Sequence, residues 1–206
     1  PIALDLNGVY VLPVDGRARY DSLPADSLAA HAERAGKSAA EVFIDLVLAT
    51  NGDLVVNYPF LNQDLAAVED MLDDPLVTLG LADAGAHVSQ IMDASQPTFF
   101  LTYWIRERQR WSIESAIRRL TSDTAELFGV RDRGVVRPGA YADLNVIDMD
   151  ALAVHPPTIV KDLPAGGRRL MQTASGYDYT VKNGVVTFDH GVHTGELPGG
   201  LVRGAQ

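Results

Sequence analysis

The chain has 206 residues and a mass of 22.2 kDa, enough for one large domain or two small ones, and its 47% hydrophobic and 21% charged residues exclude wholesale disorder. The 27 acidic residues outnumber the 17 basic ones, and the formal charge of −10 argues against nucleic acid as a partner. There is no cysteine, so any metal must be held by histidine and carboxylate side chains.

The N-terminal residues 1–26 are rich in Pro, Gly and Asp, and we expect loop there, with at most one strand at Val9–Leu12. The chain starts at Pro1 without a methionine or a basic leader, which favours a piece of a longer polypeptide and argues against secretion. No apolar run approaches the roughly 18 to 20 residues of a membrane helix. We therefore expect a soluble, cytoplasmic protein without a membrane partner.

The next segment predicts alternating helices and strands. Regular structure is expected from Ser27, and Ser38 and Glu41 have the spacing of a capping box before a helix that stops at Asn51-Gly52. The strand at 77–81 is apolar apart from Thr78, which is typical of a parallel sheet covered on both faces. The order of elements is the capped helix, a strand at 54–58, a helix at 64–72 and the strand at 77–81.

From residue 82 onward the pattern first favours helices and then strands. A loop of small and acidic residues is expected over 82–96, followed by helices near 97–108, 113–120 and 121–128. Beyond about residue 130 we expect a β-rich module, with a strand at 142–147 and a hairpin of 177–182 with 185–188 across Asn183-Gly184.

Three residues in the small-residue loop are candidates for chemistry. Asp83 directly follows the strand at 77–81, and catalytic groups cluster at the carboxyl ends of strands in parallel α/β folds. His87 and Asp93 are candidates for substrate binding. Each has an alternative interpretation: Asp83 as the cap of a turn, His87 as a hydrogen-bonded loop residue, and Asp93 as the start of the following helix.

Two other groups of residues are interpreted as surface. His190 and His193 have the spacing of a metal pair but lie in a turn-rich segment with no third ligand nearby. A basic stretch is expected to be solvated on helix faces; it consists of Arg106, Arg108, Arg110, Arg118 and Arg119.

Four segments carry a family resemblance. Phe128-Gly129-Val130-Arg131-Asp132-Arg133-Gly134 and Arg137 to Asp148 resemble the "FGL-x-DRG…PG-x-xADL" segment of metal-dependent amidohydrolases. Leu79 to His87 and Thr194 to Arg203 are similar to the N-acyl-D-amino-acid deacylase (D-aminoacylase) branch. The similarity runs from about Ser27 to Arg203.

The resemblance implies an α/β fold: the C-terminal segments of a (β/α)8 TIM-type barrel over 1–130, followed by a small β-sandwich portion over 131–206. It implies that Asp83 is the general base and acid, and a possible metal ligand, beside a zinc ion that activates water. The other zinc ligands of the family precede the residues present here, so the isolated chain is expected to be inactive. The family's His-Pro-Arg element is replaced by Asp93-Ala94-Ser95-Gln96-Pro97-Thr98.

Two hypotheses follow. The first is a zinc amidohydrolase that cleaves a small-molecule amide of the N-acyl-amino-acid type. No Lys or Arg lies between Asp83 and Arg106 to pair with a substrate carboxylate, so we expect this enzyme to accept uncharged amides about as well as acids. The second is a non-catalytic folding or interaction module. In both cases we expect association with the remaining N-terminal part or with a second copy, because an incomplete barrel leaves open the helix faces that carry Val42, Leu46, Leu65 and Val68.

Overall fold

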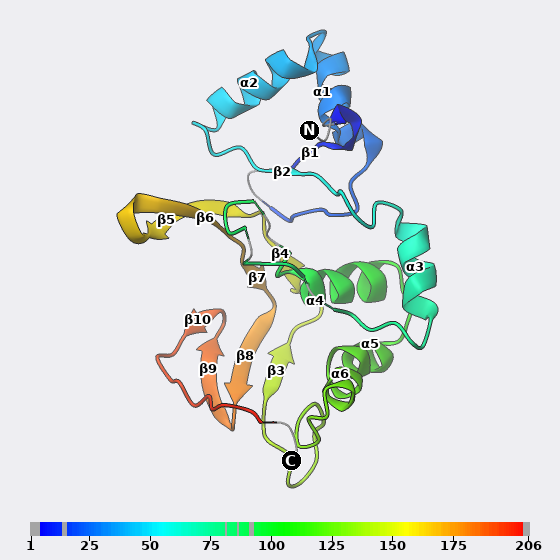
Figure 1. Ribbon diagram of the computed structural model, residues 1–206, viewed down its shortest axis with the longest axis vertical. Coiled ribbons are helices and arrows are strands. Elements are labelled where there is room, and N and C mark those ends of the chain that lie inside the picture. The colour runs from blue at the N-terminus through cyan, green and yellow to red at the C-terminus, as the bar shows by residue number, and fades with distance from the viewer. Residues whose placement is uncertain (1–4, 14–15, 81, 86, 91–92, 204–206) are drawn as a thin grey trace. The chain divides into compact units, whose positions relative to one another are not determined.

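Each of the two units of the chain is assembled from segments that lie far apart in the sequence (Figure 1). The computed structural model describes residues 5–13, 16–80, 82–85, 87–90 and 93–203. The first unit comprises residues 1–74, 85–92 and 155–172, and the second comprises 75–84, 93–154 and 173–206. The predicted domain boundary after residue 130 stays a prediction.

Serine caps start both helices of the first unit's core. Helix α1 (Leu28–Ala35) follows Ser27, whose hydroxyl accepts a hydrogen bond from the Ala30 amide at 3.1 Å. Helix α2 (Ala39–Ala49) starts with the predicted capping box, because Ser38 and Glu41 each accept a hydrogen bond from the other's amide. Both starts are therefore fixed by residues three positions apart.

The core of the first unit lies between these helices and the N-terminal segment. Val9, Leu28, Ala32 and Val42 form one buried cluster, against which Leu46 packs. The expectation that the Val42 and Leu46 face of α2 stays open is therefore wrong, because α1 covers it. Leu65 and Val68 of helix α3 (Leu65–Asp73), which is capped by Asp64, are half-buried.

The strand pairing differs from the prediction. Strands β1 (Tyr10–Val11) and β2 (Val56–Asn57) lie where strands were predicted, but they pair antiparallel. The predicted parallel sheet is wrong for the described residues, in which all strand pairs are antiparallel. The predicted strand at 77–81 is also wrong over 77–80, because no described strand pairs with it; Leu81 lies outside the described residues.

One hairpin in the first unit was not predicted. Strands β5 (Thr158–Leu163) and β6 (Gly167–Met171) pair antiparallel across the short helical turn η4 (Pro164–Gly166).

Two short helices precede α1 in the first unit. They are η1 (Leu6–Gly8) and η2 (Pro24–Asp26).

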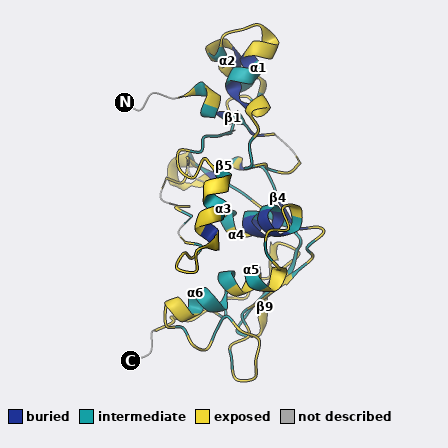
Figure 2. Cartoon of the chain, turned by 90° about the vertical axis from the view of Figure 1, so that its right-hand side faces the viewer, coloured by how far each residue is buried: buried dark blue, intermediate teal, exposed yellow. Residues whose placement is uncertain are grey.

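A continuous helix occupies the centre of the second unit. Helix α4 (Gln96–Phe99) continues into the π-helix η3 (Phe100–Glu107), in which the Arg108 amide reaches the Tyr103 carbonyl five residues back at 2.8 Å. Buried residues gather on this helix (Figure 2). Helices α5 (Ile113–Leu120) and α6 (Ser122–Leu127) follow, and all three predicted helical regions are confirmed.

The β-rich part of the second unit contains a four-stranded antiparallel sheet in the order β10-β9-β8-β3. The hairpin predicted at Asn183-Gly184 is confirmed, and both residues have the positive φ, 51° and 81°, of a tight two-residue turn. The structure is mixed α/β without a closed barrel in the described ranges, and a sandwich stays a prediction. The strands are β3 (Leu144–Ile147), β4 (Ala153–Val154), β7 (Ala174–Ser175), β8 (Tyr177–Lys182), β9 (Val185–Asp189) and β10 (Val192–His193), with β4 paired to β7.

Within the described part of the chain, no helix has the length and apolar character needed to cross a membrane.

Candidate active site

Asp83 lies in the predicted loop and has an unusual backbone conformation. Its φ is +52°, in the left-handed region that aspartate tolerates better than most residues, and Gly85 follows with φ +91°. The Asp83 side chain is exposed. Asp83 therefore presents an exposed carboxylate beside the turn at 84–85, shortly after the segment 77–80, which is not a strand here.

Asp93 lies in the same unit and interacts electrostatically with Asp83. The Asp93 residue is exposed to solvent, but its carboxyl group is partly desolvated by neighbouring atoms. This desolvation, and secondarily the negative charge of Asp83, raise the pKa of the Asp93 carboxyl above its ordinary value. The Asp93 carbonyl accepts a hydrogen bond from the Gln96 amide at 3.0 Å, at the start of α4. Two of the three predicted residues therefore interact electrostatically within one unit, and their role in a site stays a prediction.

His87 belongs to the first unit, so its predicted place beside Asp83 stays a prediction. It is exposed, and its carbonyl accepts a hydrogen bond from the Gln90 amide at 2.7 Å, as expected for a tight turn.

The described residues do not make a complete metal site. None of their His, Asp and Glu side chains form a group of three or more that could hold a metal ion, whereas zinc in proteins takes at least three such ligands. Asp83 and Asp93 alone therefore do not fit zinc. His190 and His193 are exposed, as predicted: His190 faces Asp178 at 3.4 Å, and His193 Nδ1 accepts a hydrogen bond from the Gly195 amide.

Arg106 corrects the expectation of a fully solvated basic stretch. Its side chain is only 22% exposed, and Nη1 donates to the carbonyls of Met149 at 2.8 Å and Leu152 at 2.6 Å. Arg110 and Arg119 lie over the Trp111 ring. Only tertiary contacts reveal these roles, because a charged residue on a helix is normally solvated.

A charged network that the sequence analysis missed lies in the family-like segment. The Asp143 carboxylate accepts hydrogen bonds from the Lys182 ammonium at 2.9 and 3.0 Å, from the backbone amide of Asn183 at 2.9 Å, and from the Arg133 guanidinium. The Arg133 guanidinium lies 4.1 Å from the centre of the Tyr141 ring. Partial burial alone would raise the pKa of Asp143, but these donors outweigh it and hold the pKa below its ordinary value.

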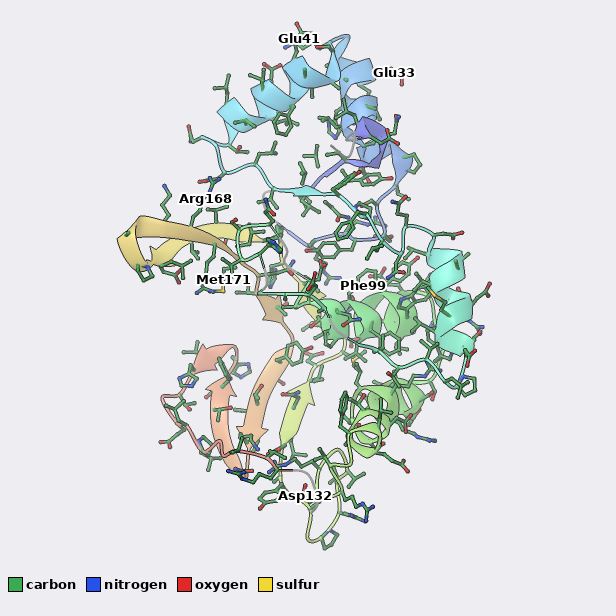
Figure 3. The ribbon with its side chains drawn as sticks, viewed as in Figure 1. Glu33, Glu41, Phe99, Asp132, Arg168 and Met171 are labelled. Atoms are coloured by element: carbon green, nitrogen blue, oxygen red, sulfur yellow. The ribbon has the colours of Figure 1, made fainter. Side chains whose placement is uncertain are left out.

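This network explains why the segment has its sequence. Asp132 lies in the loop before β3 (Figure 3), and its carbonyl accepts a hydrogen bond from the Tyr141 amide. The Gly184 amide donates a hydrogen bond to the Ala142 carbonyl. Gly134 has φ +79°, and a Cβ there would lie 3.0 Å from the Thr121 backbone. The segment therefore packs closely against the start of α6 and joins the residues before β3 to the 183–184 turn, which is a structural role.

Comparison with known proteins identifies the family of the chain. Residues 24–188 match the amidohydrolase family. An uncharacterized protein of Mycobacterium bovis is 31% identical over 140 residues, covering 62% of this chain and 21% of that protein. N-acyl-D-aspartate deacylase of Alcaligenes xylosoxydans is 29% identical over 124 residues, 56% of this chain and 24% of that protein.

A solved structure is similar in fold. A structure of D-aminoacylase, described for its binuclear metal center, matches with a TM-score of 0.51 and 23% identity, covering 91% of this chain and 36% of that one. At this identity the match shows the fold alone. The chain spans about a third or less of the length of these proteins. Because the family match extends over most of the residues, the chain belongs to the amidohydrolase family.

Proposed function

We propose that this chain is part of a hydrolase that cleaves the amide bond of N-acyl-amino-acid substrates, with Asp83 as the residue that transfers the proton. The observation that carries the proposal is the exposed Asp83 carboxylate, held at positive φ in the loop, in the same unit as the exposed Asp93 at the start of α4. The charge of Asp83 also acts on Asp93. Membership of the amidohydrolase family and the similarity to N-acyl-D-aspartate deacylase supply the reaction class.

The two carboxylates suit different tasks. An ionised Asp83 accepts the proton of the attacking water and then donates it to the nitrogen of the leaving amine, which is general base and then general acid catalysis. Asp93 holds a proton more readily than an ordinary aspartate, and a protonated carboxyl donates a hydrogen bond to the substrate. His87 is proposed as a further substrate contact.

The described residues alone do not fit zinc, so we derive no step through a metal. In the proposal, zinc is held mainly by residues outside the described part of the chain.

The test uses the longest natural polypeptide that contains these residues. Purified protein is incubated with N-acetyl-D-aspartate, N-acetyl-D-glutamate and their L enantiomers, and the released amino acid is quantified. We expect hydrolysis of the D substrates at a rate well above that of buffer. Absence of release from all four substrates contradicts the proposed reaction, and release from the L substrates alone contradicts the assigned branch.

An interaction module is the second candidate function, and one observation favours it. Helix α2 exposes apolar side chains at helical spacing, with Phe43 42%, Ile44 56% and Leu48 69% exposed. Sedimentation of the 206-residue chain tests it: we expect association that is weakened by Leu48→Glu. A stable monomer at all concentrations contradicts this candidate.

A further inference from the structure

Helix α4–η3 leads directly out of the Asp93 loop, and it is fastened to the β-rich part of its own unit at two points. Near its start, the Thr98 hydroxyl and the Tyr177 hydroxyl are 2.8 Å apart, and Thr98 is 6% exposed. Near its end, Arg106 donates to the carbonyls of Met149 and Leu152. Both contacts join residues more than 40 positions apart, so local sequence does not explain them.

The surface that receives these contacts is itself rigidly built. Leu152 is fully buried, and a Cβ on Gly176 would lie 2.5 Å from its backbone, so the two chain segments are in direct contact. The Asp148 amide donates to the Gly176 carbonyl at 2.9 Å, and the Ser175 hydroxyl donates to the Ala151 carbonyl at 3.0 Å. Tyr177 follows directly on this segment, at the start of β8.

The connection between the helix and the candidate site is short. Thr98 lies in the first turn of the helix, where the Gln96 amide donates to the Asp93 carbonyl and the Phe99 amide donates to the Ser95 carbonyl. Displacement of Thr98 therefore displaces Asp93. Phe99 lies on the same turn and stacks on Tyr103 with ring centres 5.0 Å apart, which stiffens this part of the helix (Figure 3).

We propose that Tyr177 and Arg106 are positioning residues that hold the first turn of α4 and thereby fix the position of Asp93 at the start of that helix. The inference rests on the proposed function for its consequence in catalysis. A loop carboxylate that contacts substrate must be held close to its productive position, because a displaced carboxyl makes a weaker hydrogen bond to the bound substrate. The described loop residues Asp83, Ala84, His87 and Asp93 are all exposed, so packing does not hold their side chains.

The main variant is Tyr177→Phe, which removes only the hydroxyl. Tyr179→Phe is the matched control, because Tyr179 lies on the same strand and its hydroxyl has no hydrogen-bond partner among the described residues. Loss of one neutral hydrogen bond is worth about fivefold in an equilibrium. We expect Tyr177→Phe to raise KM about fivefold while kcat stays within twofold, and Tyr179→Phe to change neither.

Thr98 provides the second half of the test. Thr98→Val is expected to match Tyr177→Phe, the double variant to be no worse than either single variant, and Thr98→Ser to retain wild-type KM, because the two hydroxyls act as one pair. Additive effects, or equal losses in Tyr179→Phe, overturn the proposal. Arg106→Gln is a less informative variant, because it leaves two carbonyls without their donor and endangers folding.

Amide hydrogen exchange of the 206-residue chain separates this proposal from the proposed function. We expect Tyr177→Phe to speed exchange of the Gln96 and Phe99 amides about fivefold, with no change in Tyr179→Phe. Unchanged exchange overturns the positioning role even in an active enzyme. If the wild-type protein hydrolyses no substrate, the proposed function fails, and the exchange result alone decides whether Tyr177 holds the loop.

Discussion

Asp143 and the pair of Asp83 and Asp93 show how differently one protein uses the same side chain. Asp143 is surrounded by donors from Lys182, the Asn183 amide and Arg133, which keep it ionised. For Asp93, partial burial of the carboxyl raises its pKa, and the negative charge of Asp83 raises it further. A carboxylate whose charge is neutralised by its surroundings stabilises the fold, whereas one that has not been neutralised stays available to exchange a proton.

The largest expected effect concerns Asp83. In the complete enzyme, Asp83→Asn should lower kcat by about 10²–10⁴, the range for loss of a general base, while leaving folding intact. Asp162→Asn is the control, because Asp162 forms an exposed ion pair with Arg169 in the other unit. Activity of Asp83→Asn within threefold of wild type would show that Asp83 only shapes the turn.

The next effect concerns stability at Asp143. Asp143→Ala should lower the free energy of unfolding by about 1–2 kcal/mol, because several charge-assisted hydrogen bonds are lost from a half-buried site. In the folded protein the pKa of Asp143 lies below its unfolded value of about 3.9. The variant should therefore show its full loss in the free energy of unfolding at pH values above about 3.9. It should disappear as the pH falls through the folded pKa.

Urea denaturation of the 206-residue chain at several pH values measures this difference. Asp162→Ala is the matched control, because its Arg169 pair is exposed and is expected to contribute less. Equal losses in the two variants, or a loss at Asp143 that does not depend on pH, would remove the contrast between the network and an ordinary surface ion pair.

Asp93→Asn should have the opposite sign. Because the folded pKa of Asp93 lies above the unfolded value, its ionisation disfavours the folded state as the pH rises through the folded pKa. The variant should be more stable than wild type at pH 7, by up to about 0.5 kcal/mol for an exposed residue, and no more stable below about pH 4. If the variant instead loses stability at pH 7, the Asp93 carboxylate accepts a stabilising hydrogen bond, as the Asp143 carboxylate does.

The smallest effect is expected for the charge of the substrate. The sequence has no Lys or Arg between Asp83 and Arg106, and the Arg106 guanidinium already donates to two carbonyls. The kcat/KM values for an N-acetyl-D-amino acid and its carboxamide should therefore agree within about tenfold. A preference for the acid above roughly 10³-fold would demonstrate a cationic partner supplied from elsewhere in the protein.

The sequence by itself determined the elements that depend on neighbouring residues. Ser38 and Glu41 start α2, Asp64 starts α3, and Asn183-Gly184 forms the β8–β9 hairpin, because each signal acts over two to four residues. The position of Asp83 in a turn is of the same kind. These interactions exist wherever the rest of the chain lies.

The tertiary structure alone decided which distant groups meet. Arg106 and Met149 are 43 residues apart, and Lys182 and Asp143 are 39 apart, so no local pattern distinguishes them from solvated surface charges. The same reason explains the incorrect strand at 77–80 and the incorrect parallel sheet. A segment forms a strand only where its backbone pairs with that of another strand. Strand β2 pairs with β1, and the pairing is antiparallel.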